Sequence, residues 1–576
     1  MKQLWKYIRP YRLQAAAAPV FKMLEALMDL FVPLVVADLI DTAIAAKDMK
    51  MILYRAMILV ILALVSLGFA VTAQFFSARS AVGSACDIRE ALFNHIQSLS
   101  TGQCEKIGAD TLMTRLTSDI NQIQTAINMG LRLLLRSPFI VFGSLIMAFT
   151  IDGKAAAVFA VAIPFLLVIV LGIMLVTIPM YKKVQGYLDR LSVLTRENLS
   201  GVRVLRAFTQ EKKSVHDFKE ADNTYTSYVI FTGRITSLLN PVTFLIVNLA
   251  TCVLIHTGAL QVNAGILQQG QVVALYNYMA QMIVELIKLS SLMITLNKAA
   301  ACARRVSDVF EIQPDMMDGN DVHDTEKVES ICFDHVGYSY HASSARALSD
   351  ITFTANSNQM IGIIGGTGSG KSTLAKLMCR LLDAKEGTIL INDHPIREYS
   401  RKQLSDMIGL VPQKAMLFSG TIRDNIQMGK EDASDEEIFQ ALQIAQAKEV
   451  VDGKKEGLDT IIEQGGKNLS GGQKQRLTIA RAIVKKPQIL ILDDSSSALD
   501  YATDARLRQS ISKMHDCIVF VISQRISSIR QCDQILVLDH GRLAGIGTHQ
   551  SLLDSCSVYR QIYDSQSSKQ DVQEGL

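Results

Sequence analysis

The sequence predicts an all-α polytopic membrane domain fused to an α/β domain. Three observations predict this. First, 49% of the 576 residues are hydrophobic, 20% are charged and the mean hydropathy is +0.23, a balance too apolar for an ordinary soluble enzyme and too charged for a purely membrane-embedded chain. Second, long charge-free runs fill the first half of the chain. Third, strand-like and helical patterns alternate in the second half.

Net charge and cysteine spacing give no support to two other classes, nucleic-acid-binding proteins and disulfide-rich proteins. The formal net charge of +3 is small for this length, so composition gives no argument for a nucleic acid partner. The nine cysteines are odd in number, have scattered spacing and contain no C-x-x-C pair. We therefore expect free thiols in a reducing compartment rather than a disulfide framework.

Charge-free runs define the candidate membrane spans, because an ionised side chain at bilayer depth costs several kcal/mol and a spanning helix needs about 20 residues. A polar, glycine-containing break at 261–271 divides the longest run into two helices. The first candidate is the weakest, since five charged residues interrupt it. The pattern predicts spans within 56–78, 137–151 and 155–181, with two in 235–284, and the candidate within 13–43 becomes the sixth span by its pattern together with the family resemblance given below.

Lysine and arginine positions predict the orientation. Lys2, Lys6, Arg9 and Arg12 lie at the N-terminus, and eight further basic residues lie in 182–213. Cytoplasmic segments near membrane ends carry such an excess, so both regions are expected inside, with long helices projecting into the cytosol. No cleavable signal peptide is expected. The compact N-terminus, without an Arg/Ser-rich presequence, favours a bacterial inner (plasma) membrane over a eukaryotic organellar one, with both termini cytoplasmic.

The second half begins after a turn-rich acidic stretch. The predicted organisation is a membrane domain at 1–312, a linker at 313–326, an α/β domain at 327–566 and a polar tail at 567–576.

The predicted α/β domain contains a candidate phosphate-binding loop. The apolar strand 360–364 is followed by a G-x-x-x-x-G-K-S motif and then by a helix beginning at Thr373. Glycines let main-chain N–H groups converge on phosphate oxygens, a lysine supplies positive charge and a serine can hold Mg²⁺. The alternative is a glycine-rich turn with a chance lysine. The motif residues are Gly365, Gly366, Thr367, Gly368, Ser369, Gly370, Lys371 and Ser372.

A second apolar strand, 489–492, runs into Asp493, whose carboxylate is suited to holding the Mg²⁺ shell. Alone this signal would be weak, because apolar strands often end in aspartate. Three further elements strengthen it: Gln413 in a V-P-Q tripeptide, Asp500 in an S-A-L-D tetrapeptide, and the pentapeptide Leu469, Ser470, Gly471, Gly472 and Gln473.

Together these elements resemble the nucleotide-binding domain of the ATP-binding cassette (ABC) family. Six spans ahead of one such domain resemble an ABC exporter half-transporter of the type I, or type IV, exporter architecture. The resemblance implies that ATP and Mg²⁺ are bound between the phosphate loop of one half and the signature pentapeptide of another. It also implies that Gln413 senses Mg²⁺ and the attacking water, and that coupling helices lie near 108–119 and 204–218. Tyr340 is similar to the aromatic residue that stacks on adenine, although it could also be an ordinary strand tyrosine.

Two positions depart from the family pattern. Asp494 stands where the family has a glutamate general base, and Gln524 stands where it has a histidine. The shorter acid withdraws its carboxylate by about 1.5 Å, and an amide cannot become cationic near neutral pH. The intact signature serves the opposite nucleotide. The chain thus resembles the degenerate-site subunit of bacterial heterodimeric multidrug-type ABC exporters, with a partner that carries Glu and His at the matching positions.

Alternatives remain open at this point. The chain could form a homodimeric exporter with slow ATP hydrolysis, or a regulatory or channel-like ABC subunit. A soluble cassette ATPase acting on nucleic acid is disfavoured by the charge-free spans. As an exporter, the chain is expected to move a small amphiphilic, drug-like, lipid or peptide substrate out of the cytoplasm.

Charged residues inside the spans suggest a substrate path. Glu285 and Lys288 lie three residues apart on one face of the sixth span, with Asn277 about two turns earlier. Intramembrane charges usually face a cavity or pair with each other, so these residues could line the path or form a purely structural ion pair. Lys22, Glu25 and Asp29 in the first span permit the same two interpretations.

Overall fold

The computed structural model describes residues 2–319, 327–340, 346–495 and 498–574, and these residues form two compact units. Unit 1 comprises Met1–His95 and Asp110–Ile312, and unit 2 comprises Ile96–Ala109 and Gln313–Leu576. The sequence placed 96–109 with the membrane domain. In the structure this segment belongs to unit 2, because Gln103 Nε2 donates to the Gln313 carbonyl oxygen at 2.8 Å and Glu105 pairs with Lys376 at 3.1 Å.

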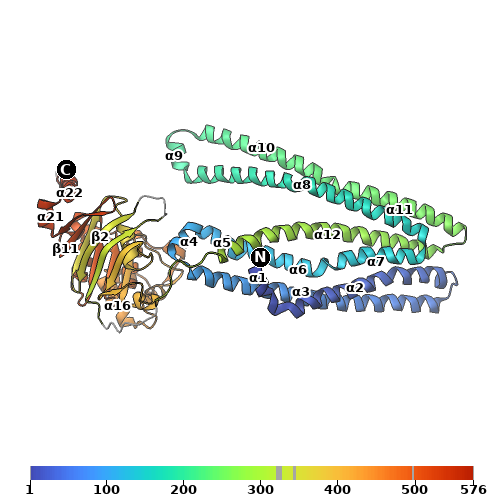
Figure 1. Cartoon of the computed structure of the whole chain (residues 1–576), viewed down its shortest axis with the longest axis horizontal. Helices are drawn as coiled ribbons and strands as arrows, with labels where there is room; N and C mark the ends of the chain where they lie inside the picture. The colour runs from blue at the N-terminus through green and yellow to red at the C-terminus, as the bar shows by residue number, and fades with distance from the viewer. Residues whose placement is uncertain (1, 320–326, 341–345, 496–497, 575–576) are drawn as a thin grey trace. The chain divides into compact units, whose positions relative to one another are not determined.

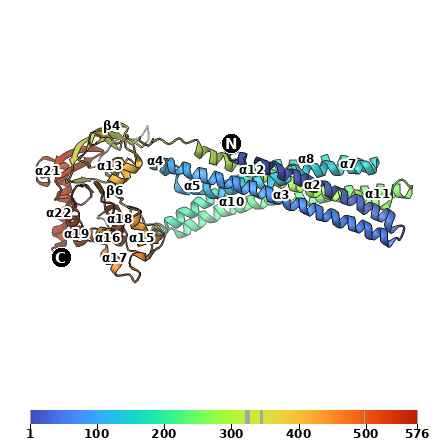
Figure 2. The same ribbon diagram turned by 90° about the horizontal axis from the view of Figure 1, so that it is seen from below.

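Unit 1 is entirely helical. Its long helices run side by side in antiparallel pairs, and α8 and α10 are joined at one end by the short α9 (Figures 1 and 2). The helices are α1 Lys2–Ile8, η1 Arg9–Tyr11, α2 Arg12–Asp38, η2 Leu39–Ile44, α3 Met49–Ser98, α5 Ala109–Thr114, η3 Arg115–Asp119, α6 Ile120–Leu133, α7 Arg136–Ile151, α8 Gly153–Ser200, α9 Val202–Ala207, α10 Glu211–Ser237, α11 Leu239–Asn263 and α12 Gln269–Phe310.

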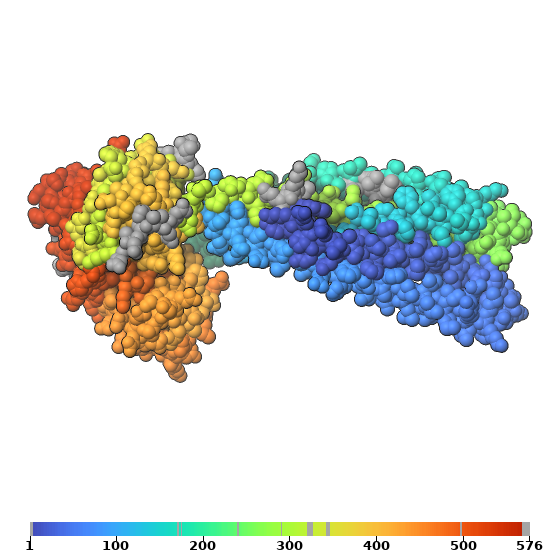
Figure 3. Space-filling view, turned by 60° about the horizontal axis from the view of Figure 1, so that its bottom comes forward, coloured from blue at the N-terminus to red at the C-terminus, as the bar shows by residue number. Residues whose placement is uncertain are grey.

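Membrane-spanning potential is clear for four helical stretches of the described residues, by length and composition: Met49–Ser98, Ala109–Ile151, Glu211–Asn263 and Gln269–Phe310. The α3 stretch exposes many apolar side chains along its length, and α3 forms much of the blue surface in Figure 3. The other two expected spans correspond to α2, which carries several charges, and to α8, whose apolar part includes Gly153–Leu166. For these two helices, spanning stays a prediction.

The core of unit 1 lies where α2, α7, α8 and α12 meet. Leu30, Phe159, Leu275 and Tyr278 are buried there. The Tyr278 hydroxyl donates to the Leu30 carbonyl oxygen at 2.6 Å, which ties α12 to α2. This packing brings α2, α7 and α12 close enough for their charged side chains to interact.

Unit 2 is built on three sheets. The largest has the strand order β12-β11-β3-β10-β9-β6, with all neighbours parallel except β11 and β12. An antiparallel sheet has the order β2-β1-β4-β5, and β7 pairs with β8. The strands are β1 Ser330–Tyr338, β2 Leu348–Asn356, β3 Met360–Gly365, β4 Glu386–Ile391, β5 His394–Pro395, β6 Ile408–Val411, β7 Gly420–Thr421, β8 Ile461–Ile462, β9 Ile489–Asp493, β10 Ile518–Ile522, β11 Gln534–Asp539 and β12 Arg542–Gly547.

Helices cover these sheets, and β9 and β10 are buried along their whole length. The helices of unit 2 are α4 Thr101–Ile107, α13 Lys371–Met378, α14 Arg401–Met407, α15 Ile422–Gln427, α16 Asp435–Ile444, α17 Lys448–Asp452, η4 Gly457–Asp459, η5 Gln464–Gly466, α18 Gly471–Ile483, α19 Tyr501–Ile511, α20 Ile526–Ile529, α21 His549–Ser555 and α22 Ser557–Glu574.

The register of the parallel strands positions the site. Val411 pairs with Leu492, and Ile522 pairs with both Asp493 and Ile363. The carboxyl ends of β6, β9, β10 and β3 therefore meet at one edge of the sheet, the usual place for ligands in an open α/β sheet.

The two ranges expected to hold coupling helices contain short helices. Residues 108–119 include α5 and η3, and the separate short helix α4 precedes this range. Residues 204–218 include the second half of α9 and the start of α10. Their coupling role stays a prediction.

Candidate nucleotide-binding site

The phosphate loop lies between β3 and α13. Gly368 and Gly370 have φ of 80° and 99°, and Gly370 is the N-cap of α13. A Cβ atom on Gly370 would lie 2.6 Å from Leu348 Cδ2 and 2.7 Å from the Ala347 carbonyl oxygen. Glycine is needed here for both backbone conformation and space, and it starts the helix whose first N–H groups lie at the loop.

Lys371 folds back over this loop. Its Nζ donates to the carbonyl oxygens of Gly365 at 2.8 Å and Gly366 at 2.7 Å. Burial lowers the pKa of the Lys371 ammonium, and the nearby carboxylates of Asp494 and Asp493 oppose this shift. A buried ammonium held by neutral carbonyls is suited to bind phosphate oxygens, which carry the opposite charge.

Ser372 and Asp493 form the candidate metal position. The Ser372 hydroxyl donates to Asp493 Oδ1 at 3.4 Å, and Asp493 is buried at the end of β9. Burial raises the pKa of the Asp493 carboxyl, assisted by Asp494, while Ser372 and Lys371 act in the opposite direction. Hydroxyl and carboxylate oxygens are ligands that Mg²⁺ prefers, so these two residues fit the ion.

Gln413 and Asp494 meet across the edge of the sheet. Gln413 Nε2 donates to Asp494 Oδ2 at 3.3 Å. Asp494 has a φ of 48°, and its main-chain N–H donates to the Ile522 carbonyl oxygen at 2.9 Å. Asp494 is thereby held through both its main chain and its side chain, and its place at the general-base position stays a prediction from the resemblance.

Gln524 follows β10, next to the phosphate-loop strand. The Ser523 N–H donates to the Ile363 carbonyl oxygen at 3.0 Å. The Gln524 carbonyl oxygen accepts from Gln566 Nε2 at 2.7 Å, and Gln566 Oε1 accepts from the Ile526 N–H at 2.9 Å. Sequence analysis missed Gln566, because nothing in a polar C-terminal helix indicates contact with a loop some 40 residues earlier.

Tyr340 lies beside the start of α13. Its hydroxyl is 3.2 Å from Thr373 Oγ1, and its ring packs edge-on against Tyr338, with centroids 5.1 Å apart at 89°. The side chain is about half exposed. A ring held at this position is available for stacking on a base.

The signature pentapeptide begins α18. Ser470 is the N-cap: Gln473 N–H donates to Ser470 Oγ at 3.3 Å, and Ser470 N–H donates to Gln473 Oε1 at 3.0 Å. Leu469 is buried and anchors the turn. Gly471 has open space around it, whereas a Cβ on Gly472 would lie 3.1 Å from the Ala498 carbonyl oxygen.

The S-A-L-D segment therefore lies against the signature. Asp500 accepts from the Thr503 N–H at 2.9 Å and caps α19, whereas the serine at 497 lies outside the described residues. No hydrogen bond among the residues described joins the signature to the phosphate loop, and α13 and α18 lie apart (Figure 2). Within one chain, the phosphate loop and the signature pentapeptide therefore lie apart.

The candidate substrate-path residues lie in unit 1. Glu285 pairs with Lys288 at 2.9 Å, and both line a cavity together with Asn277. Arg136 links this pair to Asp29 and Glu25, which the sequence treated as a separate group. The sequence signal that could have indicated this link was Arg136 itself, which directly precedes the charge-free run 137–151.

Comparisons with known proteins agree with this architecture. The family model described as the ABC transporter transmembrane region matches residues 16–286, and the one described as ABC transporter matches residues 348–497. YfiB of Bacillus subtilis, an uncharacterized ABC transporter ATP-binding protein, is 34% identical over 98% of both chains. YheI of the same organism, a probable multidrug resistance ABC transporter ATP-binding/permease protein, is 32% identical over 98% of this chain and 97% of its own.

A solved structure has the same fold. A bacterial Atm1-family ABC exporter with ATP bound superposes with a TM-score of 0.76 at 23% identity, covering 96% of this chain and 98% of that one. With full-length relatives above 30% identity and both family models matched in order, the assignment is direct. The chain belongs to the ABC transporter family, and its helical transmembrane domain followed by an α/β nucleotide-binding domain is the domain arrangement of an exporter half-transporter.

Proposed function

We propose that this half-transporter is one subunit of an ATP-driven exporter, that its own phosphate-loop site hydrolyses ATP slowly, and that its signature completes a fast site on a non-identical partner. The observation that carries this proposal is the pairing of Asp494 with Gln413 at 3.3 Å, next to a chain segment bearing Gln524. The general-base position and the histidine position, Asp494 and Gln524, both differ from the family pattern.

The expected loss of hydrolysis rate follows from the shorter side chain of Asp494 and from the protonation chemistry of Gln524. An aspartate carboxylate lies about 1.5 Å short of a glutamate carboxylate, and a misplacement near 1 Å costs on the order of 100-fold in rate. Gln524 can donate a hydrogen bond to phosphate, but its amide cannot take up an additional proton and become cationic at neutral pH. The pocket is thus suited to bind ATP and poorly suited to cleave it.

Nucleotide binding uses residues that are all present. Lys371 and the loop N–H groups would bind phosphate oxygens and Tyr340 would stack on adenine, while Ser372, Asp493 and Gln413 would hold Mg²⁺, whose charge would offset that of the phosphates. ATP bound between two halves draws them together because it binds the closed state more tightly than the open one. Helices near 108–119 and 204–218 carry that motion to the spans, with both termini cytoplasmic in the inner membrane.

The contrast between two altered catalytic positions and an intact signature leads us to expect a non-identical partner subunit. Leu469, Ser470 and Gln473 keep the family signature, and that signature acts on the nucleotide of the other subunit. A homodimer would contain two slow sites. We expect a second half-transporter with Glu and His at the matching positions, and a small amphiphilic, drug-like, lipid or peptide substrate.

The test measures ATP turnover by the purified full chain alone. We expect slow turnover, a rise on the order of 10- to 100-fold in the Asp494→Glu, Gln524→His double variant, and no change in the surface control Asp452→Glu. Brisk turnover by the unmodified chain, or no gain in the double variant, would contradict the proposal. ATP-driven substrate uptake by vesicles containing both subunits then distinguishes an exporter from a regulatory or channel-like subunit.

A further inference from the structure

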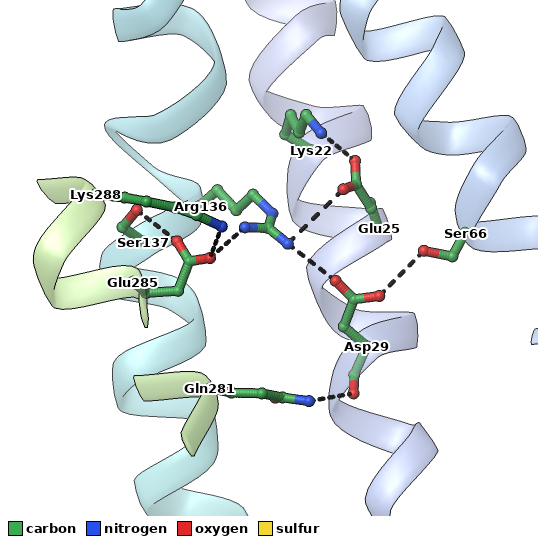
Figure 4. A network of polar contacts seen from close by, with 9 residues as sticks. All are labelled: Lys22, Glu25, Asp29, Ser66, Arg136, Ser137, Gln281, Glu285 and Lys288. Atoms are coloured by element: carbon green, nitrogen blue, oxygen red, sulfur yellow. Dashed lines mark hydrogen bonds and ion pairs between the residues drawn. The ribbon is translucent and has the colours of Figure 1, made fainter. Parts of the chain in front are cut away.

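Charged side chains from three helices of unit 1 form one network centred on Arg136 (Figure 4). Nη1 of Arg136 lies 2.5 Å from Glu285 Oε1, while Nη2 lies 3.0 Å from Asp29 Oδ2 and 3.8 Å from Glu25 Oε1. Two lysines lie at the ends of the network: Lys22 pairs with Glu25 at 2.5 Å, and Lys288 pairs with Glu285 at 2.9 Å. Three cations face three acids, so the formal charge of the network is zero.

The network members differ in accessibility. Glu285 accepts from Arg136, Lys288 and the Ser137 hydroxyl, and its side chain is only 3% exposed. In contrast, the side chain of Asp29 is 32% exposed and that of Lys288 is 43% exposed. The accessible charges are therefore one carboxylate and one ammonium, while the groups between them are mostly buried.

Both accessible charges line the same cavity. It has a volume of about 520 Å³, within the usual range for small-molecule sites. Asn277 and Gln281 add amides, and Gln281 Nε2 donates to the Asp29 carbonyl oxygen at 3.4 Å. The mostly buried Arg136 and Glu285 also line it, and the rest of the lining is apolar, including Val32, Ile140 and Val284. The cavity thus combines a polar region, in which Asp29 and Lys288 are the most accessible charged groups, with an apolar wall.

This arrangement discriminates between head groups. A purely cationic ligand is attracted by Asp29 and repelled by Lys288, and a purely anionic ligand meets the reverse. A ligand with both charges can place each of them beside the accessible group of opposite sign, and such effects are stronger in a poorly solvated site than in water. A neutral pair of separated charges is therefore selective for a dipolar ion.

We propose that this cavity binds the zwitterionic end of the transported substrate, with its cationic group at Asp29, its anionic group at Lys288 and its apolar part along the Val32 and Val284 wall. This inference rests on the proposed export function and specifies the substrate class. Two sources share the required chemistry: a lipid-like amphiphile with a zwitterionic head group, and a short apolar peptide with free termini.

The test measures binding by calorimetry to the full chain in dodecyl maltoside, a detergent without charge. Four probes are compared: N-dodecyl-N,N-dimethylglycine, dodecyltrimethylammonium, dodecanoate and the dipeptide Leu-Leu. We expect the betaine to bind about tenfold more tightly than either singly charged dodecyl probe. Leu-Leu binding as tightly as the betaine indicates a peptide source, and weaker Leu-Leu binding indicates a lipid-like source.

Two variants test the charge assignment by changing the ranking rather than the overall affinity. Asp29→Asn should make dodecanoate the best of the three dodecyl probes, whereas Lys288→Met should make dodecyltrimethylammonium the best. Matched controls are Asp38→Asn, at the end of α2 where Asp38 pairs with Arg55, and Lys298→Met, further along α12. Both controls should keep the ranking of the unmodified chain.

Equal affinities for the three dodecyl probes, a ranking unaltered by both variants, or no binding of any probe would overturn this inference. ATP turnover of the same preparations is recorded separately. Failure of the ligand assignment therefore remains distinguishable from failure of the proposed ATP-driven function.

Discussion

The side-chain amide of Gln566 holds the main chain on both sides of Arg525: its Nε2 donates to the Gln524 carbonyl oxygen at 2.7 Å, and its Oε1 accepts from the Ile526 N–H at 2.9 Å. The Arg525 guanidinium in turn lies 5.1 Å from the ring centroid of Tyr501, next to Asp500. The C-terminal helix α22 is thus connected to the segment that carries Gln524.

Replacing Gln566 with alanine should loosen this segment. Each lost hydrogen bond contributes about 1 kcal/mol, so amide hydrogen exchange at 523–527 should accelerate by roughly tenfold or more, with a smaller loss of ATP affinity. Gln561→Ala, an exposed glutamine in the same helix, is the matched control. Unchanged exchange at 523–527 in Gln566→Ala would show that the amide does not hold the segment.

Lys371→Met should weaken ATP binding about 10- to 100-fold, because a charge-assisted contact contributes about 1.5–3 kcal/mol. Lys376→Met is the control, since Lys376 lies in the same helix but pairs with Glu105 rather than facing the loop. Equilibrium binding of a fluorescent ATP analogue gives both affinities. Equal losses in the two variants would count against a phosphate role for Lys371.

Mg²⁺-dependent nucleotide binding should decline on acidification at a pH above 3.8, the ordinary value for aspartic acid, because burial raises the pKa of Asp493. The sign follows from protonation: below this raised pKa the carboxyl is neutral and cannot hold Mg²⁺. By the same linkage, the carboxyl stabilises the fold at low pH and loses this contribution as pH rises through the raised value.

The measurement compares ATP affinity with Mg²⁺ and with EDTA across acidic pH. Asp493→Asn should remove most of the difference between the two conditions and flatten its pH dependence. If the Mg²⁺-dependent part of binding in the unmodified chain persists unchanged down to pH 3.8, the assigned role of Asp493 is wrong.

The sequence predicted elements whose residues are adjacent in the chain and missed contacts between distant segments. The phosphate loop was predictable because strand, glycines, Lys371 and helix follow one another, and the membrane architecture because charge-free runs are long. Hydrophobic patterns do not report which charged side chains from different helices meet, so Arg136 was not recognised as the centre of the network. The assignment of 96–109 to unit 2 likewise depends on tertiary contacts of Gln103 and Glu105.

Gly370→Ala should destabilise the nucleotide-free protein, because the added Cβ would lie 2.6 Å from Leu348 Cδ2 and the φ of 99° is strained for alanine. A residue held in such a region costs about 1–3 kcal/mol, and steric overlap adds to this. Gly366→Ala is a matched control from the same loop, since a Cβ there has no heavy atom within 4 Å. Thermal unfolding in detergent should show a clear drop for Gly370→Ala and little change for Gly366→Ala. Equal midpoints would mean that the loop relaxes around residue 370, and that its glycine is kept for phosphate approach rather than for backbone geometry.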